Sequence, residues 1–160
     1  TSTDSESTGE SFLQISYLTG KALMPAEKIF FDTNILLYLL SADTEKANQA
    51  EAIVEQGGLI SVQVLNEMAN VAIRKLAMPW HEVNEILDLI VSLCTVEPLT
   101  IETHDVGRRV AERYKLSVYD AMIVASAQLA GCEILYTEDM HDGLLVDEQL
   151  RIINPFKLDA

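Results

Sequence analysis

Short apolar runs alternate with longer segments of helical periodicity along most of this chain, and no other feature constrains its fold as strongly. The apolar runs predict strands at residues 29–31, 59–61, 95–99, 133–137 and 151–153. The segments between them predict a first helix that begins just after residue 34. They predict five further helices at residues 43–56, 62–76, 80–93, 102–114 and 118–130. Strands that alternate with helices form a parallel sheet with helices on both faces. We therefore expect an α/β fold, a three-layer α/β/α domain around a central parallel sheet.

The amino-terminal segment, residues 1–27, does not share this pattern. Its first ten residues contain no apolar side chain, and residues 11–23 are moderately apolar without a clear period. This composition predicts a tail that is disordered or not native to the domain. A tag remnant, a read-through segment and a docking arm all fit its second half. The remaining residues, 28–160, are long enough to form one domain with a sizeable core, since 49% of the chain is hydrophobic.

Composition excludes several classes of protein. Cys94 and Cys132 lie far apart and form no CxxC motif, so neither a zinc site nor a disulfide framework is expected. The chain has no run of 18 apolar residues, and its acidic amino terminus is unlike a signal peptide, so we expect a cytoplasmic protein with no membrane partner. A net charge of −14 argues against a generic nucleic-acid binder. More than half of the eleven basic residues nevertheless gather at Arg74–Lys75 and within residues 108–115.

Four acidic residues occupy positions that a solvated surface explains poorly. Asp32 and Asp139 each follow the carboxyl end of a predicted strand. Glu67 lies about two helical turns beyond the second strand, on a face with apolar neighbours, and Asp120 lies in the first turn of a helix above an apolar stripe. Because sites in open α/β sheets are built at the carboxyl ends of the strands, we expect these four side chains to gather at that edge.

Each acid also has a purely structural explanation. Asp32 is a candidate N-cap of the helix that follows it, and Asp120 is a candidate partner of Ser117 in an S-x-x-D capping box. Glu67 fits as an outlier on an amphipathic helix, and Asp139 as one of several acids in a turn. Taken together, these explanations require four coincidences at one end of one sheet.

Clustered carboxylates repel one another unless a cation lies among them. Oxygen ligands suit Mg²⁺ or Mn²⁺, and such ions support phosphoryl transfer by in-line displacement. A phosphatase of the haloacid-dehalogenase type would need a second aspartate where Asn34 stands, and a receiver domain would need a lysine within residues 116–150, which contain none. The chain also lacks a P-loop and a GxGxxG motif.

Several short motifs, in this order, resemble the PIN-domain ribonucleases and, more closely, the VapC-type toxins of toxin–antitoxin pairs. The resemblance runs from Lys28 to Phe156. The motifs that carry it are Phe31-Asp32-Thr33-Asn34, Ser61 with Glu67 six residues on, Tyr119-Asp120-Ala121-Met122-Ile123-Val124-Ala125, Thr137-Glu138-Asp139 and the closing Ile153-Asn154-Pro155-Phe156.

The resemblance implies a Mg²⁺- or Mn²⁺-dependent endoribonuclease that leaves 5′-phosphate and 3′-hydroxyl ends, forms a homodimer and is inhibited by a cognate antitoxin. It assigns the metal site and catalysis to the four acids, Asp32, Glu67, Asp120 and Asp139. It also implies that three neighbouring residues donate hydrogen bonds to these acids, namely Thr33, Asn34 and Thr137. One departure is Asp142, where the family often has an aromatic residue, which leaves its part in the metal site open. The main alternative is a PIN-fold interaction module without catalysis, and a small Mg²⁺-dependent phosphatase is a weaker one.

Overall fold

The structure, a computed structural model, describes residues 27–157, and the predicted tail lies almost entirely outside these residues. Within the described part, the strands form one six-stranded sheet in the order β3-β2-β1-β4-β6-β5. The strands are β1 (Ile29–Phe31), β2 (Gly58–Ser61), β3 (Cys94–Glu97), β4 (Ile134–Tyr136), β5 (Leu145–Val146) and β6 (Leu150–Ile153). All neighbouring strands are parallel except β5, which runs antiparallel to β6.

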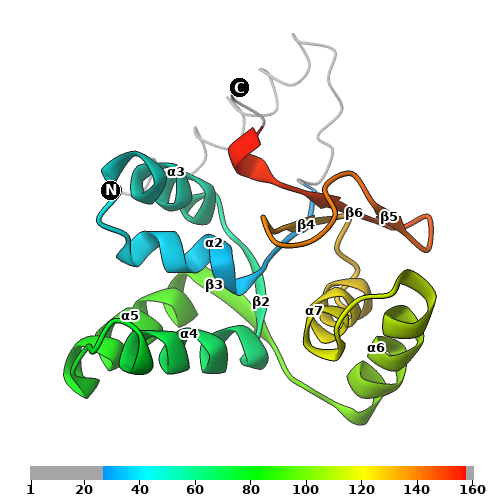
Figure 1. Ribbon diagram of the computed structural model, residues 1–160, viewed down its shortest axis with the longest axis horizontal. Helices are drawn as coiled ribbons and strands as arrows, with labels where there is room; N and C mark the ends of the chain where they lie inside the picture. Colours follow the sequence, from blue (N-terminus) through cyan, green and yellow to red (C-terminus); the bar gives the residue numbers. More distant parts are fainter. Residues whose placement is uncertain (1–26, 158–160) are drawn as a thin grey trace, which may run out of the picture.

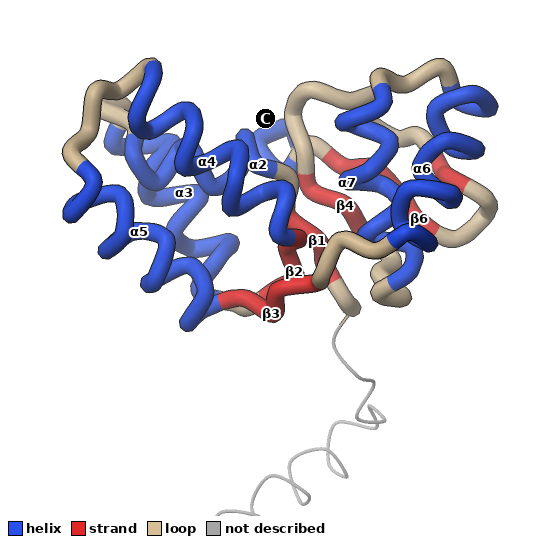
Figure 2. Tube along the Cα trace, turned by 90° about the horizontal axis from the view of Figure 1, so that it is seen from below, coloured by secondary structure: helices blue, strands red, loops and turns tan. Residues whose placement is uncertain are grey.

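Helices cover both faces of this sheet, as Figures 1 and 2 show, with α2 to α5 on one side and α6 and α7 on the other. The α-helices are α2 (Thr33–Leu37), α3 (Thr44–Glu55), α4 (Val62–Arg74), α5 (Trp80–Leu93), α6 (Ile101–Tyr114) and α7 (Val118–Leu129), and the 3₁₀ helices are η1 (Tyr38–Leu40) and η2 (Pro155–Lys157). The predicted three-layer α/β/α architecture is therefore confirmed. None of the helices in the described residues has the length and the apolar stretch needed to cross a membrane.

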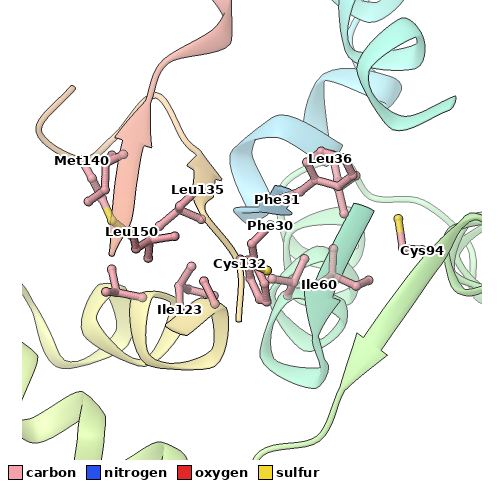
Figure 3. Close-up of a cluster of buried hydrophobic side chains, with 14 of the residues drawn as sticks. Phe30, Phe31, Leu36, Ile60, Cys94, Ile123, Cys132, Leu135, Met140 and Leu150 are labelled. Atoms are coloured by element: carbon pink, nitrogen blue, oxygen red, sulfur yellow. The ribbon is translucent and has the colours of Figure 1, made fainter. Parts of the chain in front are cut away.

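The core lies between the sheet and both helical layers. Phe30, Phe31, Ile60 and Leu135, from the three central strands, are fully buried and meet in the cluster of Figure 3. Helix α7 packs onto this cluster with an unbroken buried run from residue 121 to residue 127, as a helix enclosed by other elements does. These contacts hold β1 and α7 in place. They therefore also position the residues that follow β1 and those at the start of α7.

Glycine allows α6 and α7 to approach each other closely. A Cβ atom added at Gly107 would lie 2.5 Å from the Met122 sulfur and 3.6 Å from the Ala121 carbonyl oxygen. A larger residue at position 107 would therefore require the end of the Met122 side chain to move, while the Ala121 carbonyl oxygen lies at ordinary contact distance.

Two details differ from the sequence prediction. Helix α4 ends at Arg74, two residues before the predicted end of the helix, and Leu76 beyond it is 46% exposed. The two-residue strand β5 was not predicted, and it makes the sheet mixed rather than wholly parallel. The hairpin turn between β5 and β6 places Asp147 and Glu148 at φ 49° and 58°, in the left-handed region. Strand β3 is one of the two edge strands of the sheet.

Side-chain hydrogen bonds hold that turn in place. The Asp147 carboxylate accepts hydrogen bonds from Tyr114 (2.9 Å) and Gln128 (2.9 Å) and pairs with Arg113 at 3.2 Å. These bonds join the β5–β6 hairpin to α6 and α7, and they lower the pKa of Asp147, with the Gln128 amide as the largest cause.

Candidate functional site

Asp32 lies at the carboxyl end of β1, the central strand on which the site is built. Its Oδ1 atom accepts a hydrogen bond from the Thr33 backbone N–H at 2.7 Å, so it caps α2. Its Oδ2 atom accepts from the Thr137 hydroxyl at 2.8 Å and from the Asn34 amide at 3.3 Å. The side chain is therefore both a helix cap and part of a wider polar network that joins β1 to the end of β4.

The pKa of Asp32 is raised from 3.8 to about 6, because the residue is only 5% exposed and burial disfavours its charged form. The hydrogen bonds from Thr137 and Thr33 oppose this rise, and the negative charges of Asp120 and Glu67 add to it. The Asp32 carboxylate thus lies within electrostatic reach of two acids from other elements.

Asn34 connects the start of α2 to the turn after β4. Its amide nitrogen lies within hydrogen-bond distance of Thr137 Oγ1 (3.0 Å) and Asp139 Oδ2 (3.1 Å), and its carbonyl oxygen accepts from the Glu138 backbone N–H at 3.2 Å. The Asp139 backbone N–H also donates to Thr137 Oγ1, at 3.2 Å. These bonds hold the exposed Asp139 beside Asp32 at the same edge of the sheet.

Glu67 reaches the edge from α4 and is half-buried, as its apolar neighbours predict. The Thr33 hydroxyl donates to Glu67 Oε2 at 2.5 Å, and the Gln63 amide donates to Glu67 Oε1 at 2.9 Å. Sequence reasoning missed Gln63. Its only signal was the position one helical turn before Glu67, which places both side chains on one face of α4.

Asp120 lies in the first turn of α7, where Ser117 is the N-cap. The Ser117 hydroxyl accepts from the Asp120 backbone N–H at 3.2 Å. Among the bonds of the described residues, the Asp120 carboxylate does not return a bond to the Ser117 backbone, whereas Thr100 and Thr103 form such a reciprocal capping box in α6. Burial raises the pKa of Asp120; the Ser117 hydroxyl opposes this effect, and the charges of Asp139 and Glu67 reinforce it.

The four predicted acids therefore share one edge of the sheet, and their charges act on one another. None of the three ion pairs among the described residues involves them; those pairs are Lys46–Glu138, Arg108–Asp105 and Arg113–Asp147. Nor do these side chains converge fully, since no three acid, histidine or cysteine side chains in the described part lie close enough together to hold a metal ion.

The donor set nevertheless fits a hard divalent cation, because it consists of carboxylate oxygens with no basic side chain paired to them. An orphaned polar atom also lies at this edge. The Ser61 hydroxyl, at the end of β2, is fully buried and has no hydrogen-bond partner. The pairing of Phe30 with Leu59 places Ser61 level with Asp32.

Asp142 contacts another part of the chain. Its Oδ1 atom accepts a hydrogen bond from the Asn154 backbone N–H at 2.8 Å. Asn154 in turn accepts from the Phe156 backbone N–H at 3.0 Å. In this arrangement the Asp142 side chain anchors the segment that follows β6.

Comparison with known families identifies the fold. The family model described as the PIN domain matches residues 29–141, most of the chain. The chain belongs to the PIN domain family. Its match begins at β1 and includes all four acids of the sheet edge. No curated protein matches the sequence of this PIN domain.

Solved structures with the same fold come from several bacteria. A protein from a Klebsiella pneumoniae toxin–antitoxin complex is 26% identical, with a TM-score of 0.61 over 80% of this PIN domain chain and 98% of its own. VapC20 from Mycobacterium tuberculosis, described as a toxin that cleaves the sarcin–ricin loop, is 19% identical, with a TM-score of 0.59 over 70% and 90%. A chain of the DNA-bound VapBC complex from Salmonella typhimurium is 21% identical, with a TM-score of 0.58 over 79% and 96%.

Proposed function

We propose that this PIN domain is a Mg²⁺- or Mn²⁺-dependent endoribonuclease that acts as the toxin of a toxin–antitoxin pair. One observation carries the proposal: acids from four separate parts of the chain lie at the carboxyl ends of the strands, where their charges act on one another, and no basic side chain in the described residues is paired to them. The likeness to a chain of a toxin–antitoxin complex and to an RNA-cleaving VapC toxin supports it.

In this proposal, the four acids would hold the ion and three neighbours would orient them. Asp32, Glu67, Asp120 and Asp139 would be the ligands, and Thr33, Asn34 and Thr137 donate hydrogen bonds to three of them, Asp32, Glu67 and Asp139. Because the acids do not converge fully, binding an ion requires some of these side chains to rotate towards a common point. When bound, a divalent ion supplies an activated water and neutralises charge on the phosphoryl group.

Protonation of Asp32 limits this chemistry at low pH. With a pKa of about 6, the Asp32 carboxyl is largely protonated below that pH and competes poorly for a cation. Above it, the carboxylate is available as a ligand. The expected products are RNA fragments with 5′-phosphate and 3′-hydroxyl ends.

The proposed partners follow from charge and from the comparisons. An antitoxin that places an arginine among the carboxylates would form charge-assisted hydrogen bonds and compete with the metal. Similar chains are described in a toxin–antitoxin complex and in a DNA-bound VapBC complex. A homodimer is part of the same proposal, and exposed apolar side chains beside the site, Tyr119 (72% exposed) and Val118 (54% exposed), support it.

Cleavage of an RNA panel with and without Mn²⁺ tests the proposal. The wild type should cut at least one RNA only with the metal, and Asp32→Ala should abolish cutting, because the variant lacks the central ligand. Asp88→Ala is the matched control, since Asp88 is an exposed acid on α5. Cutting by Asp32→Ala that resists EDTA would contradict the proposal, and RNA binding without any cutting by the wild type would favour the non-catalytic interaction module.

A further inference from the structure

Gln63 joins two helices that lie on opposite sides of the sheet (Figure 2). Its amide nitrogen carries two hydrogens, and each has an acceptor: Glu67 Oε1 at 2.9 Å and the Tyr119 backbone carbonyl oxygen at 3.0 Å. Glu67 belongs to α4 and Tyr119 to α7. No other hydrogen bond joins these two helices within the described residues. The Gln63 side chain is therefore the one hydrogen-bonded link between α4 and α7 in the described residues, beside the four acids at the carboxyl ends of the strands.

The first of these bonds restricts Glu67. A glutamate side chain has three rotatable torsions, and fixing it costs conformational entropy. Here one donor holds each carboxylate oxygen, Gln63 on Oε1 and Thr33 on Oε2. Together they determine both the position and the plane of the carboxylate.

The second bond acts on Asp120. Tyr119 directly precedes Asp120 in the first turn of α7, so the bond to its carbonyl oxygen fixes the backbone on which Asp120 stands. The Gln63 side chain thus contacts one acid directly and the neighbouring residue of a second acid. The charges of these two acids, Glu67 and Asp120, act on each other.

We propose that Gln63 is a positioning residue that sets the Glu67 carboxylate and the Asp120 backbone relative to each other, so that both acids reach one divalent cation. This inference rests on the proposed function, because it assumes that the acids share an ion. Both hydrogens of the Gln63 amide are used within the chain, so its proposed role is to orient other residues. A glutamine is well suited to the task, since one atom offers two hydrogens to two acceptors.

The test compares Mn²⁺ affinity, measured by calorimetry on the full chain, between the wild type and Gln63→Met. Methionine keeps the length and the helix propensity of glutamine but has no hydrogen-bond donor. We expect Mn²⁺ binding to weaken about 10–100-fold, the usual effect of losing a residue that orients a ligand. Gln149→Met is the matched control, because the Gln149 amide also donates to a backbone carbonyl, that of Gln128 at 3.5 Å, on another part of the surface.

A double-mutant cycle shows whether the effect passes through Glu67. In a Glu67→Gln background, adding Gln63→Met should weaken Mn²⁺ binding less than it does in the wild type, because the carboxylate that it orients is already gone and only its bond to the Tyr119 carbonyl remains to be lost. In RNA cleavage, Gln63→Met should lower kcat and leave KM within about twofold. If Gln63→Met does not fold, as judged by circular dichroism in EDTA, Gln63→Leu replaces it.

The outcomes separate this inference from the proposed function. If the wild type binds Mn²⁺ and Gln63→Met binds it equally well, the role of Gln63 is overturned and the proposed function is not affected. Fully additive effects in the cycle would overturn its action through Glu67. A wild type that neither binds Mn²⁺ nor cuts RNA would overturn both.

Discussion

The Asp32 carboxylate accepts hydrogen bonds from Thr33, Asn34 and Thr137, yet burial still raises its pKa to about 6. The hydrogen bonds favour the charged form, so the direction of the shift shows that desolvation and the neighbouring acids outweigh them. Capping a helix would not by itself require a buried carboxylate with this pKa. The fold is therefore less stable when the Asp32 carboxyl is charged than when it is protonated.

This shift predicts how the stability of the metal-free protein depends on pH. The folded-state pKa lies above the unfolded value of 3.8, so the stabilisation from proton binding is fully present below pH 3.8 and is lost as pH rises through about 6. A shift of this size corresponds to roughly 3 kcal/mol, at 1.36 kcal/mol per unit. Urea unfolding in EDTA between pH 4 and 7 should show wild type losing stability relative to Asp32→Asn, which does not titrate.

Adding Mn²⁺ should reverse this trend, because the ion binds the deprotonated carboxylate. The rise in melting temperature that Mn²⁺ gives the wild type should grow as pH increases through about 6. Parallel stability curves for wild type and Asp32→Asn would show that Asp32 does not carry the raised pKa.

Residues with a positional signal could be predicted, and residues defined only by contacts could not. Asp32 was predicted because it directly follows an apolar run, and Asp120 because it begins an apolar stripe. Gln63 has only its position one helical turn before Glu67, and Ser61 was noted only as part of the motif with Glu67. A glutamine on a helix surface and a serine at a strand end are common, and their places beside Glu67 and Asp32 arise only from the packing of α4 and β2.

At the scale of elements, α7 was predictable and the β5–β6 hairpin was not. Helix α7 has a long apolar run with Ser117 before it and Gly131 after it, and it extends over Val118–Leu129, close to the predicted 118–130. Strand β5 has only two residues, and its turn uses Asp147 and Glu148 where glycine or asparagine is usual. Bonds from Tyr114 and Gln128, distant in sequence, stabilise that turn.

The first turn of α7 gives a second prediction, because it separates Asp120 as a metal ligand from Asp120 as a helix cap. As a cap alone, Asp120→Asn should cost about 0.3–1 kcal/mol, since a helix N-terminus favours negative charge. The raised pKa of Asp120, caused first by burial and then by Asp139 and Glu67, shows that its charge is unfavourable in the metal-free fold. We therefore expect Asp120→Asn to melt at the wild-type temperature or higher in EDTA.

With Mn²⁺, the same variant should lose cleavage and most of the metal-induced rise in melting temperature. Thermal melts with and without Mn²⁺ measure both effects. Ser117→Ala is the control, since it removes the cap hydroxyl and leaves the carboxylate in place. An Asp120→Asn protein that melts lower in EDTA and keeps its full Mn²⁺ response would mean that Asp120 serves only the helix.

At the scale of the whole molecule, the sequence predicted the layers but not the order of the strands. Alternation of strands and helices requires a covered parallel sheet. The order β3-β2-β1-β4-β6-β5 depends on long-range pairing, such as Ile29 with Ile134, which local patterns do not encode. This order places β1 between β2 and β4, and so brings Asp32, Asp139 and the start of α4 to one edge.

The same arrangement places the two basic clusters on opposite sides of the four acids. Arg74 and Lys75 lie at the end of α4, and the cluster within residues 108–115 lies along and just after α6, on the other side of the sheet (Figure 2). A strongly acidic chain that cuts RNA needs local positive charge to hold phosphates. Within the second cluster, Arg109 and Lys115 form no ion pair in the described part of the chain, whereas Arg108 pairs with Asp105 at 2.9 Å.

Replacing both Arg109 and Lys115 by alanine should therefore weaken RNA binding and flatten its salt dependence. Each phosphate contact on single-stranded RNA contributes about 0.7 to the slope of log affinity against log salt, so losing two contacts should reduce the slope by about 1.4. Arg74→Ala with Lys75→Ala should act similarly if the RNA extends across the four acids to both clusters.

Binding is measured by fluorescence anisotropy in an Asp32→Ala background, which should prevent cleavage. Arg108→Ala is the control, because its charge is already offset by Asp105. An unchanged slope in both double variants would mean that these side chains are ordinary surface charge and that the RNA is held elsewhere.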